Sequence, residues 1–347
     1  MEATWFGIIG FMLSAYVVLD GFDFGAGIIH LLVAKSDDER RTVLGSIAPV
    51  WDGNEVWLVA SGGVLVFAFP KAYAAALSGL YLPIMMVLWL IILRGLSIEL
   101  RSLQESPLWR SFWDAGFALS SSVIALVLGI SLGNLVRGLP IDDSGYFHMP
   151  LFTDFLTIHE LGAIDWYTLA TGVFSLMVLA SHGAAYVGWK SEGAVQTRAI
   201  LLGRRAAWAT AIVLLPLTFL THLVNPKLFP SLLSRLWAWP LALVAALGLL
   251  FALRGFARSR ARDAFFGSSA LIVGLLGSTA AALYPTILRS SLEDRFSLTA
   301  INSATAHHSL LIGLVWWTPA MLIALGYFTY LFRKMGGPKN GGHSTTY

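Results

Sequence analysis

The chain has 347 residues, of which 56% are hydrophobic and only 12% are charged, and its mean hydropathy is +0.71. Soluble domains carry about 25% charged residues, so this composition excludes an ordinary water-soluble protein and indicates a polytopic membrane protein. The net charge of +3 does not indicate a nucleic-acid partner, because the basic residues fall between apolar runs rather than in one patch. The absence of cysteine excludes disulfides, iron–sulfur clusters and thiolate-bound haem.

Apolar runs long enough to cross a membrane recur along the whole chain. A spanning helix needs about 20 mostly apolar residues, and nine runs meet that need: 5–33, 50–69, 73–98, 112–137, 161–188, 206–224, 236–253, 264–286 and 306–332. The first run has no basic segment before it and is too long for a signal peptide, so we predict a retained helix. The second and third runs are so close that they are predicted to form a tight hairpin.

The basic residues alternate between the connections of these nine helices. Most of the 23 Lys and Arg residues follow the first, third, fifth, seventh and ninth helices. By the positive-inside rule, this pattern places the N-terminus outside and the C-terminus in the cytoplasm. The acidic connection at 138–160 is then expected outside, and the tail at 335–347 is expected to be a flexible cytoplasmic end.

Two aspartates, Asp20 and Asp23, interrupt the first apolar run in the sequence VVLDGFDFGAG. A carboxylate near the middle of a bilayer costs about 2.5 to 3.5 kcal/mol on insertion scales, so neither is expected to face lipid. Gly21 and Gly25 form a small-xxx-small pair, which lets a neighbouring helix approach closely. The motif is therefore predicted to be a polar site buried at a helix crossing.

Further charged residues are expected in the cytoplasmic halves of the next three helices. Asp52 and Glu55 are three residues apart and share one face of the second helix. Acidic residues that run from the cytoplasm toward mid-membrane suit a proton-uptake pathway. The candidate pathway residues are Asp20, Asp23, Asp52, Glu55 and Asp114, with Arg94, Glu99 and Arg101 as ion-pair or supporting residues. The alternative is that these charges only hold four helices together. The charged run at 37–41 is predicted to be a solvated loop.

The histidines do not indicate a cofactor site. His159, His222, His307 and His308 fall near the outer ends of predicted helices, where a haem or metal site would be placed on spacing alone. His30 and His182 lie on the cytoplasmic halves of the first and fifth helices, and nothing in the sequence shows whether they face each other. Lone histidines at helix ends are more often hydrogen-bonded than ligands, so no cofactor-binding or metal-binding residue is predicted.

Several long motifs stand out along the chain, namely DGFDFGAG, SIAPVWDGNEVWL, FPKAYAAALSGLYLP, ILRGLSIELR, FWDAGF and GNLVRG. Together they closely resemble subunit II of the cytochrome bd-type quinol oxidases. The resemblance spans nearly the whole chain and is densest at 20–137. It implies a bacterial terminal oxidase of the cytoplasmic membrane that oxidises quinol and reduces dioxygen to water. It also implies a partner, subunit I, that holds two b-type haems, a d-type haem or a b-type equivalent, and the quinol site, while this chain holds no haem.

The same resemblance implies two four-helix bundles, at 5–137 and 161–286, with a peripheral ninth helix at 306–332. Family proposals place a proton pathway in subunit II. The WDGN aspartate of the family is Asp52 here, and the DGFD aspartates are Asp20 and Asp23, whereas Glu55 stands where relatives carry Gln. A passive scaffold and a stand-alone secondary transporter stay open as alternatives, although no convincing pair of broken helices or inverted repeats is found and Pro83 alone interrupts the third helix. A small accessory subunit and a structural quinone or lipid in this chain also stay open.

Overall fold

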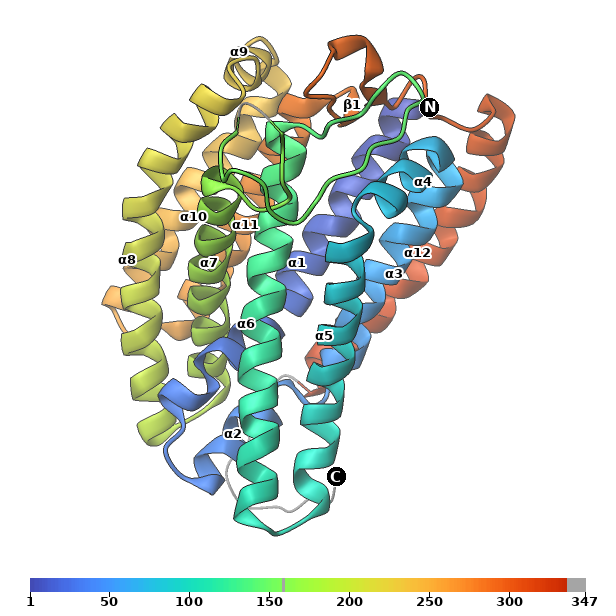
Figure 1. Ribbon diagram of the computed structural model, residues 1–347. Helices are drawn as coiled ribbons and strands as arrows, with labels where there is room; N and C mark the ends of the chain where they lie inside the picture. The colour runs from blue at the N-terminus through green and yellow to red at the C-terminus, as the bar shows by residue number, and fades with distance from the viewer. Residues whose placement is uncertain (158–159, 336–347) are drawn as a thin grey trace.

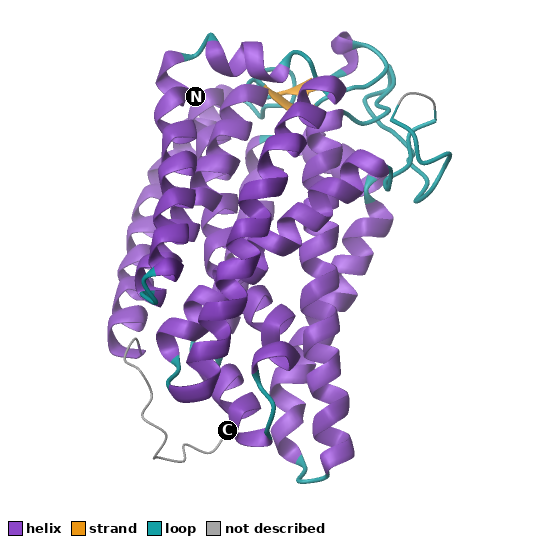
Figure 2. Cartoon of the chain, turned by 90° about the vertical axis from the view of Figure 1, so that its left-hand side faces the viewer, coloured by secondary structure: helices purple, strands orange, loops and turns teal. Residues whose placement is uncertain are grey.

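The computed structural model describes residues 1–157 and 160–335, which are almost entirely helical (Figure 1). The long helices run side by side along one axis, with connections at both ends (Figure 2). They are α1 (Glu2–Val33), α3 (Trp51–Ala68), α5 (Tyr81–Leu100), α6 (Pro107–Arg137), α7 (Trp166–Lys190), α8 (Gly193–Val224), α10 (Trp239–Ala257), α11 (Ala261–Leu283) and α12 (His307–Met335). The shorter elements are α2 (Asp37–Ile47), α4 (Pro70–Gly79), α9 (Leu228–Leu233), the 3-10 turns η1 (Arg101–Leu103), η2 (Leu236–Ala238) and η3 (Asp294–Phe296), and the antiparallel strands β1 (Thr286–Leu288) and β2 (Leu298–Thr299).

Eight of the described helices are long and apolar enough to span a membrane. They correspond to eight of the predicted runs and confirm a multi-pass membrane protein: α1, α5 with η1, α6, α7, α8, η2 with α10, α11 and α12. Helix α3, the second predicted span, is not among them. It has only 18 residues and begins with the polar sequence WDGNE. The total of nine spans stays a prediction.

The third predicted run, 73–98, is not one helix. Helix α4 ends at Gly79 and α5 starts at Tyr81, with Leu80 between them in a non-helical conformation. Pro83 accounts for the break because it has no N–H to donate to the Gly79 carbonyl. Its ring is tolerated in the first turn of α5, where that donor is not needed. The fused helix was therefore a wrong prediction, although its apolar character was correctly predicted.

The charged run at 37–41, predicted to be a solvated loop, is instead the start of helix α2. The Ser36 hydroxyl accepts a hydrogen bond from the Glu39 N–H at 3.3 Å, and the Glu39 carboxylate accepts one from the Ser36 N–H at 3.3 Å. This capping box satisfies two backbone donors at the helix start. Val43, Leu44 and Ile47 are buried on one face of α2, which packs against α1, α7 and α8. Helix α2 therefore closes the end of the bundle opposite the N-terminus, which we call the α2 end (Figure 1).

Helix α1 is central and packs against α3, α6, α7 and α11. Its closest approach is to α7, where Gly25 meets Gly183. A Cβ atom on Gly25 would lie 2.1 Å from the Leu179 carbonyl oxygen and 2.6 Å from Gly183 Cα, and one on Gly21 would lie 2.9 Å from Leu179 Cδ2. The predicted small-residue crossing is confirmed.

The long connection between α6 and α7 is fixed to both helices by Arg137, the last residue of α6. Its guanidinium donates to Asn134 Oδ1 at 2.6 Å and to the Gly162 carbonyl at 3.1 Å. It also pairs with Asp165, whose carboxylate caps the N-terminus of α7 by accepting from two backbone N–H groups at 2.8 Å. Arg137 and Asp165 are both buried. We call this group the Arg137 knot.

Candidate functional site

A buried group of charges lies between α1, α3 and α5, with Arg94 of α5 at its centre. Arg94 is fully buried, and its Nη1 donates to Asp20 Oδ1 of α1 at 2.6 Å. Its Nη2 lies 3.4 Å from Oε2 of Glu55 on α3, whose side chain is 18% exposed. The guanidinium also stands 4.4 Å from the centroid of the Phe24 ring, which is a favourable cation–π geometry. Arg94 therefore joins three helices through charge.

Asp23 lies one turn beyond Asp20 on α1 and belongs to the same group. It is fully buried and accepts a hydrogen bond from Asn54 Nδ2 at 2.8 Å, and the same nitrogen lies 3.1 Å from the Leu19 carbonyl oxygen. Asn54 precedes Glu55, so one turn of α3 supplies an amide to Asp23 and a carboxyl to Arg94. We call Asp20, Asp23, Asn54, Glu55 and Arg94 the central cluster.

The central cluster contains three carboxyl groups and a single guanidinium. One oxygen each of Asp20 and Asp23 is buried without a hydrogen-bond partner among the described residues. Unpaired charge costs several kcal/mol per ion in such surroundings, and a buried pair of carboxyls disfavours double ionisation. The central cluster therefore holds more carboxyl groups than its one guanidinium can pair with.

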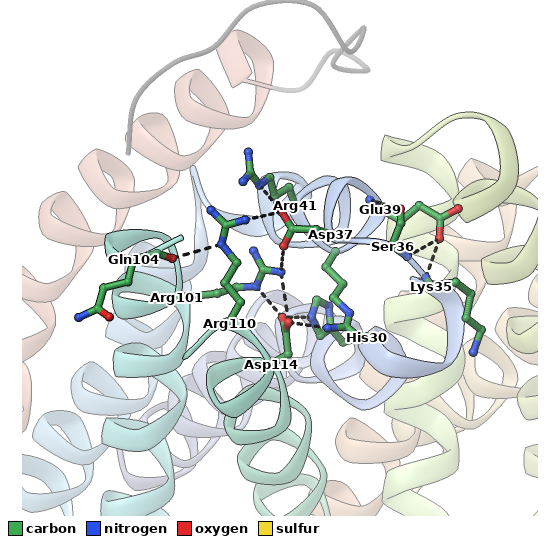
Figure 3. Close-up of polar contacts among 11 residues, drawn as sticks. His30, Lys35, Ser36, Asp37, Glu39, Arg41, Arg101, Gln104, Arg110 and Asp114 are labelled. Carbon is green, nitrogen blue, oxygen red and sulfur yellow. Dashed lines mark hydrogen bonds and ion pairs between the residues drawn. The ribbon is translucent and has the colours of Figure 1, made fainter. Parts of the chain in front are cut away.

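Asp114 belongs to a second group of charges, at the α2 end (Figure 3). Its Oδ1 is 2.7 Å from His30 Nε2 and accepts from Arg101 Nε at 2.6 Å. Its Oδ2 accepts from Arg40 Nη1 at 3.0 Å and from Arg101 Nη2 at 3.1 Å. His30, Arg101 and Asp114 are all buried. The single carboxylate of Asp114 is thus surrounded by two arginines and a histidine.

Asp37, the first residue of α2, extends this second group. It pairs with Arg101 Nη2 at 2.7 Å, with Arg110 Nη1 at 3.0 Å and with Arg41 Nε at 3.0 Å (Figure 3). Partial burial opposes ionisation of Asp37, but the hydrogen bond from Arg101 and the charges of the three arginines outweigh it and lower the pKa of this carboxyl. We call the group around Asp37 and Asp114 the distal cluster. Because its carboxylates are surrounded by cations, it is suited to anchoring α2 rather than to carrying protons.

The structure therefore divides the predicted pathway residues. Asp20, Asp23, Glu55 and Arg94 come together in the central cluster, whereas Asp114 and Arg101 lie in the distal cluster. Asp52 and Glu99 are exposed and form no ion pair within the described part of the chain. Asp52 lies one turn before Glu55 on α3.

Sequence analysis missed six residues of these clusters, namely His30, Asp37, Arg40, Arg41, Asn54 and Arg110. The signal for His30 was present, because it follows Asp23 by seven residues and therefore lies two turns along the same face of α1. Asn54 was visible inside the motif WDGNE but carries no charge. Asp37 and Arg40 were assigned to the solvated loop, and their ion pairs with Arg110 and Asp114 of α6 could not be inferred from local sequence.

The buried histidines are hydrogen-bonded within the chain. His182 Nδ1 lies 2.7 Å from Ser268 Oγ, and its Nε2 lies 2.9 Å from the Val18 carbonyl oxygen. Its ring stacks on Phe265 at 4.8 Å. Since His30 is bound to Asp114, these two histidines do not face each other.

The remaining candidate histidines lie near the ends of helices. His307 and His308 are exposed at the start of α12, and the His222 ring is 6.1 Å from the Phe229 ring. His159 lies outside the described residues. Within residues 1–157 and 160–335, no group of three or more His, Asp and Glu side chains is arranged to hold a metal ion.

Comparisons with known proteins agree along nearly the whole chain. The profile of the family described as cytochrome bd terminal oxidase subunit II matches residues 1–335. The chain is 29% identical to a probable cytochrome oxidase subunit 2 of Haemophilus influenzae, and the match covers 97% of this chain and 94% of that protein. Identity is 28% to the cytochrome bd-I ubiquinol oxidase subunit 2 of Escherichia coli K12, with the same coverage. It is 26% to the cytochrome bd ubiquinol oxidase subunit 2 of Bacillus subtilis, with 96% of each chain covered.

A solved structure shows the same fold. A chain from the structure of the bd oxidase from Geobacillus thermodenitrificans aligns with a TM-score of 0.71 at 18% identity. The alignment covers 96% of this chain and 97% of that one.

Proposed function

Because the chain belongs to the family of cytochrome bd terminal oxidase subunit II, we propose that it acts within a quinol oxidase complex of the bacterial cytoplasmic membrane. The family implies a subunit I partner and haems in the complex. We assign the haems, the quinol site and oxygen reduction to subunit I, with this chain as its haem-free support. In favour of this assignment, both ring nitrogens of the buried His182 already lie within hydrogen-bonding distance of other groups of the chain, and Nε2 of His30 is held by Asp114.

We further propose that nine helices cross the membrane, with α3 as the ninth, and that the N-terminus lies outside and the C-terminus in the cytoplasm. Basic residues of the distal cluster gather at the α2 end, as expected of a cytoplasmic surface. Two bundles, 5–137 and 161–286, with α12 at the periphery, agree with the strong packing of α5 on α6, α7 on α8 and α10 on α11. Contacts of α1 with α7 and α11 join the two bundles.

The central cluster is proposed to conduct protons from the cytoplasm toward the oxygen-reducing site. The observation that carries this proposal is the imbalance of three carboxyls against one guanidinium at a buried helix crossing. Asp52, exposed at the start of α3, and Glu55, partly exposed one turn later, would lead inward to Asp20 and Asp23. Arg94 pairs with both Asp20 and Glu55. A proton that binds to either carboxyl therefore changes the electrostatic potential at the other carboxyl. The distal cluster would serve as support.

Replacement of Asp23 by asparagine tests this role in the purified complex with its partner. Asp23→Asn keeps the shape of the side chain but cannot exchange a proton. We expect quinol-dependent oxygen consumption to fall by about a hundredfold, the lower end of what a positioned proton-transfer group contributes, with an unchanged haem absorption spectrum. Asp52→Asn should lower it less, because Asp52 is exposed to water.

The matched control is Asp38→Asn, which removes an exposed carboxylate of α2 and should leave turnover unchanged. If Asp23→Asn turns over like this control, the chain is a passive scaffold and the proton role is wrong. Uptake of an ion or solute by the chain alone in liposomes would instead favour a secondary transporter.

A further inference from the structure

An apolar groove of about 910 Å³ runs along one side of α1. Its walls come from α1, α3, the paired helices α10 and α11, and the last turns of α12. Along α1 it extends from Ala3 to Leu19, about 24 Å at 1.5 Å per residue. That length is most of the roughly 30 Å thickness of a bilayer's hydrocarbon core. The groove therefore has the dimensions and the lining of a lipid site.

The two ends of the groove differ in chemistry. Trp237 and Tyr284 line the end near the N-terminus, and such amphipathic rings are typical of a membrane–water boundary. Arg333, in the last turn of α12, lines the other end. Its side chain is exposed, and no described residue forms an ion pair with it. An unpaired guanidinium at the proposed cytoplasmic surface is complementary to an anionic headgroup.

The floor of the groove is deep because glycines lack side chains there. A Cβ atom on Gly7 would meet nothing within 4 Å, and one on Gly10 would meet only Ala280 Cβ at 3.9 Å. From Leu19 to Gly10 the groove covers nine residues of α1, about 14 Å. That distance matches one leaflet, which is half of the roughly 30 Å hydrocarbon core.

We propose that the part of the groove between Arg333 and Gly10 binds one anionic phospholipid of the cytoplasmic leaflet. The phosphate lies at Arg333, and an acyl chain passes Phe332 and Phe328 to end near Gly10. Its contacts with these rings and with the glycine floor replace the looser packing of bulk lipid. A neutral isoprenoid quinone would gain nothing from Arg333, so the charge at this end favours the phospholipid. The inference adds a ligand to this chain and does not depend on the proton role.

The test uses the purified oxidase complex, reconstituted in vesicles of phosphatidylglycerol and phosphatidylethanolamine in equal amounts and then extracted in mild detergent. Mass spectrometry counts the phospholipids that stay bound. Gly10→Leu should fill the floor and release one phosphatidylglycerol per complex. Arg333→Gln should keep a bound phospholipid but lose the preference for phosphatidylglycerol.

Two matched controls separate these effects from general damage. Gly326→Leu makes the same change on α12, at a glycine that does not line the groove. A Cβ atom added to Gly326 would meet nothing within 4 Å. Lys334→Gln removes the positive charge next to Arg333. The Lys334 ammonium donates a hydrogen bond to the Tyr330 hydroxyl at 2.9 Å and does not line the groove. Both controls should retain the lipid and its selectivity.

The proposal is overturned if Gly10→Leu retains as much phosphatidylglycerol as Gly326→Leu, or if it releases a quinone instead. It is also overturned if Arg333→Gln and Lys334→Gln show equal lipid selectivity. Crosslinking of the unmodified complex gives an independent result, because it does not depend on the folding of any variant. Phosphatidylglycerol with a photoreactive acyl chain should crosslink to Phe328, and the absence of that crosslink would contradict the site.

Discussion

Arg94 is the residue whose replacement best tests whether charge holds the central cluster together. Arg94→Met keeps a long flexible side chain but removes the only cation that pairs with Asp20 and Glu55 among the described residues. Removing one partner of a buried ion pair costs about 3 to 5 kcal/mol, because the other charge stays buried and unpaired. Arg94 and Asp20 are both 0% exposed, so screening by water does not reduce this figure. We therefore expect unfolding free energy to fall by about 4 kcal/mol.

The companion variant combines Arg94→Met with Asp20→Asn. The second change removes the carboxylate that the first one leaves unpaired, so we expect it to restore most of the lost stability. The measurement is equilibrium unfolding of the purified complex in mixed detergent micelles, followed by tryptophan fluorescence. Arg110→Met serves as the control, because its ion pair with Asp37 is partly exposed and should contribute about 1 kcal/mol or less. If Arg94→Met costs no more than Arg110→Met, charge pairing does not hold the cluster and the reasoning fails.

Three further predictions concern other parts of the structure. Asp114→Asn replaces the carboxylate that binds Arg40 of α2 by a neutral amide, so the backbone amides of α2 should exchange hydrogen faster. The control Asp38→Asn should leave their exchange unchanged. Gly25→Ala places a methyl group 2.1 Å from a backbone oxygen of α7 and should cost at least about 1 to 3 kcal/mol in the same unfolding assay. Gly45→Ala, with nothing within 4 Å of its Cβ, should cost nothing, and an equal loss in both would contradict the close crossing. The lowered pKa of Asp37 means that its contribution to stability is fully present above the ordinary aspartate pKa of about 3.9 and is lost as the pH falls through the lower folded value. The thermal midpoint of wild type should therefore exceed that of Asp37→Asn near neutral pH and converge with it in strong acid, and a constant difference at all pH values would refute this account.

Apolar runs predicted most of the long helices because a helix in lipid must satisfy its own backbone hydrogen bonds. The break at Leu80 was harder to predict, because Pro83 either ends a helix or merely kinks it, depending on its neighbours. Helix α2 was missed because its first five residues are charged. The buried face of Val43, Leu44 and Ile47, spaced for a helix, was the signal that contradicts a loop.

The pairing of the charges depended on information that the sequence does not contain. Asp20, Asp23 and Asp114 were all sensible partners for Arg94, since Asp23 and Asp114 were predicted in the same half of the bundle and Asp20 one turn away near mid-membrane. The close crossing at Gly25 and Gly183 fixes the height of α1 against α7, and such packing decides which side chains meet. The division into a central and a distal cluster is therefore a result of helix packing over long distances in sequence.

The Arg137 knot has a consequence for how the two halves of the chain can move. A long connection between helices is usually more mobile than the helices it joins. Here the Arg137 guanidinium binds the last turn of α6, the connection itself and the N-terminus of α7. The connection therefore holds α6 and α7 at a fixed angle. Any rocking of one half against the other must bend the helices or slide them across each other, and the connection between α6 and α7 would travel with them as a fixed attachment.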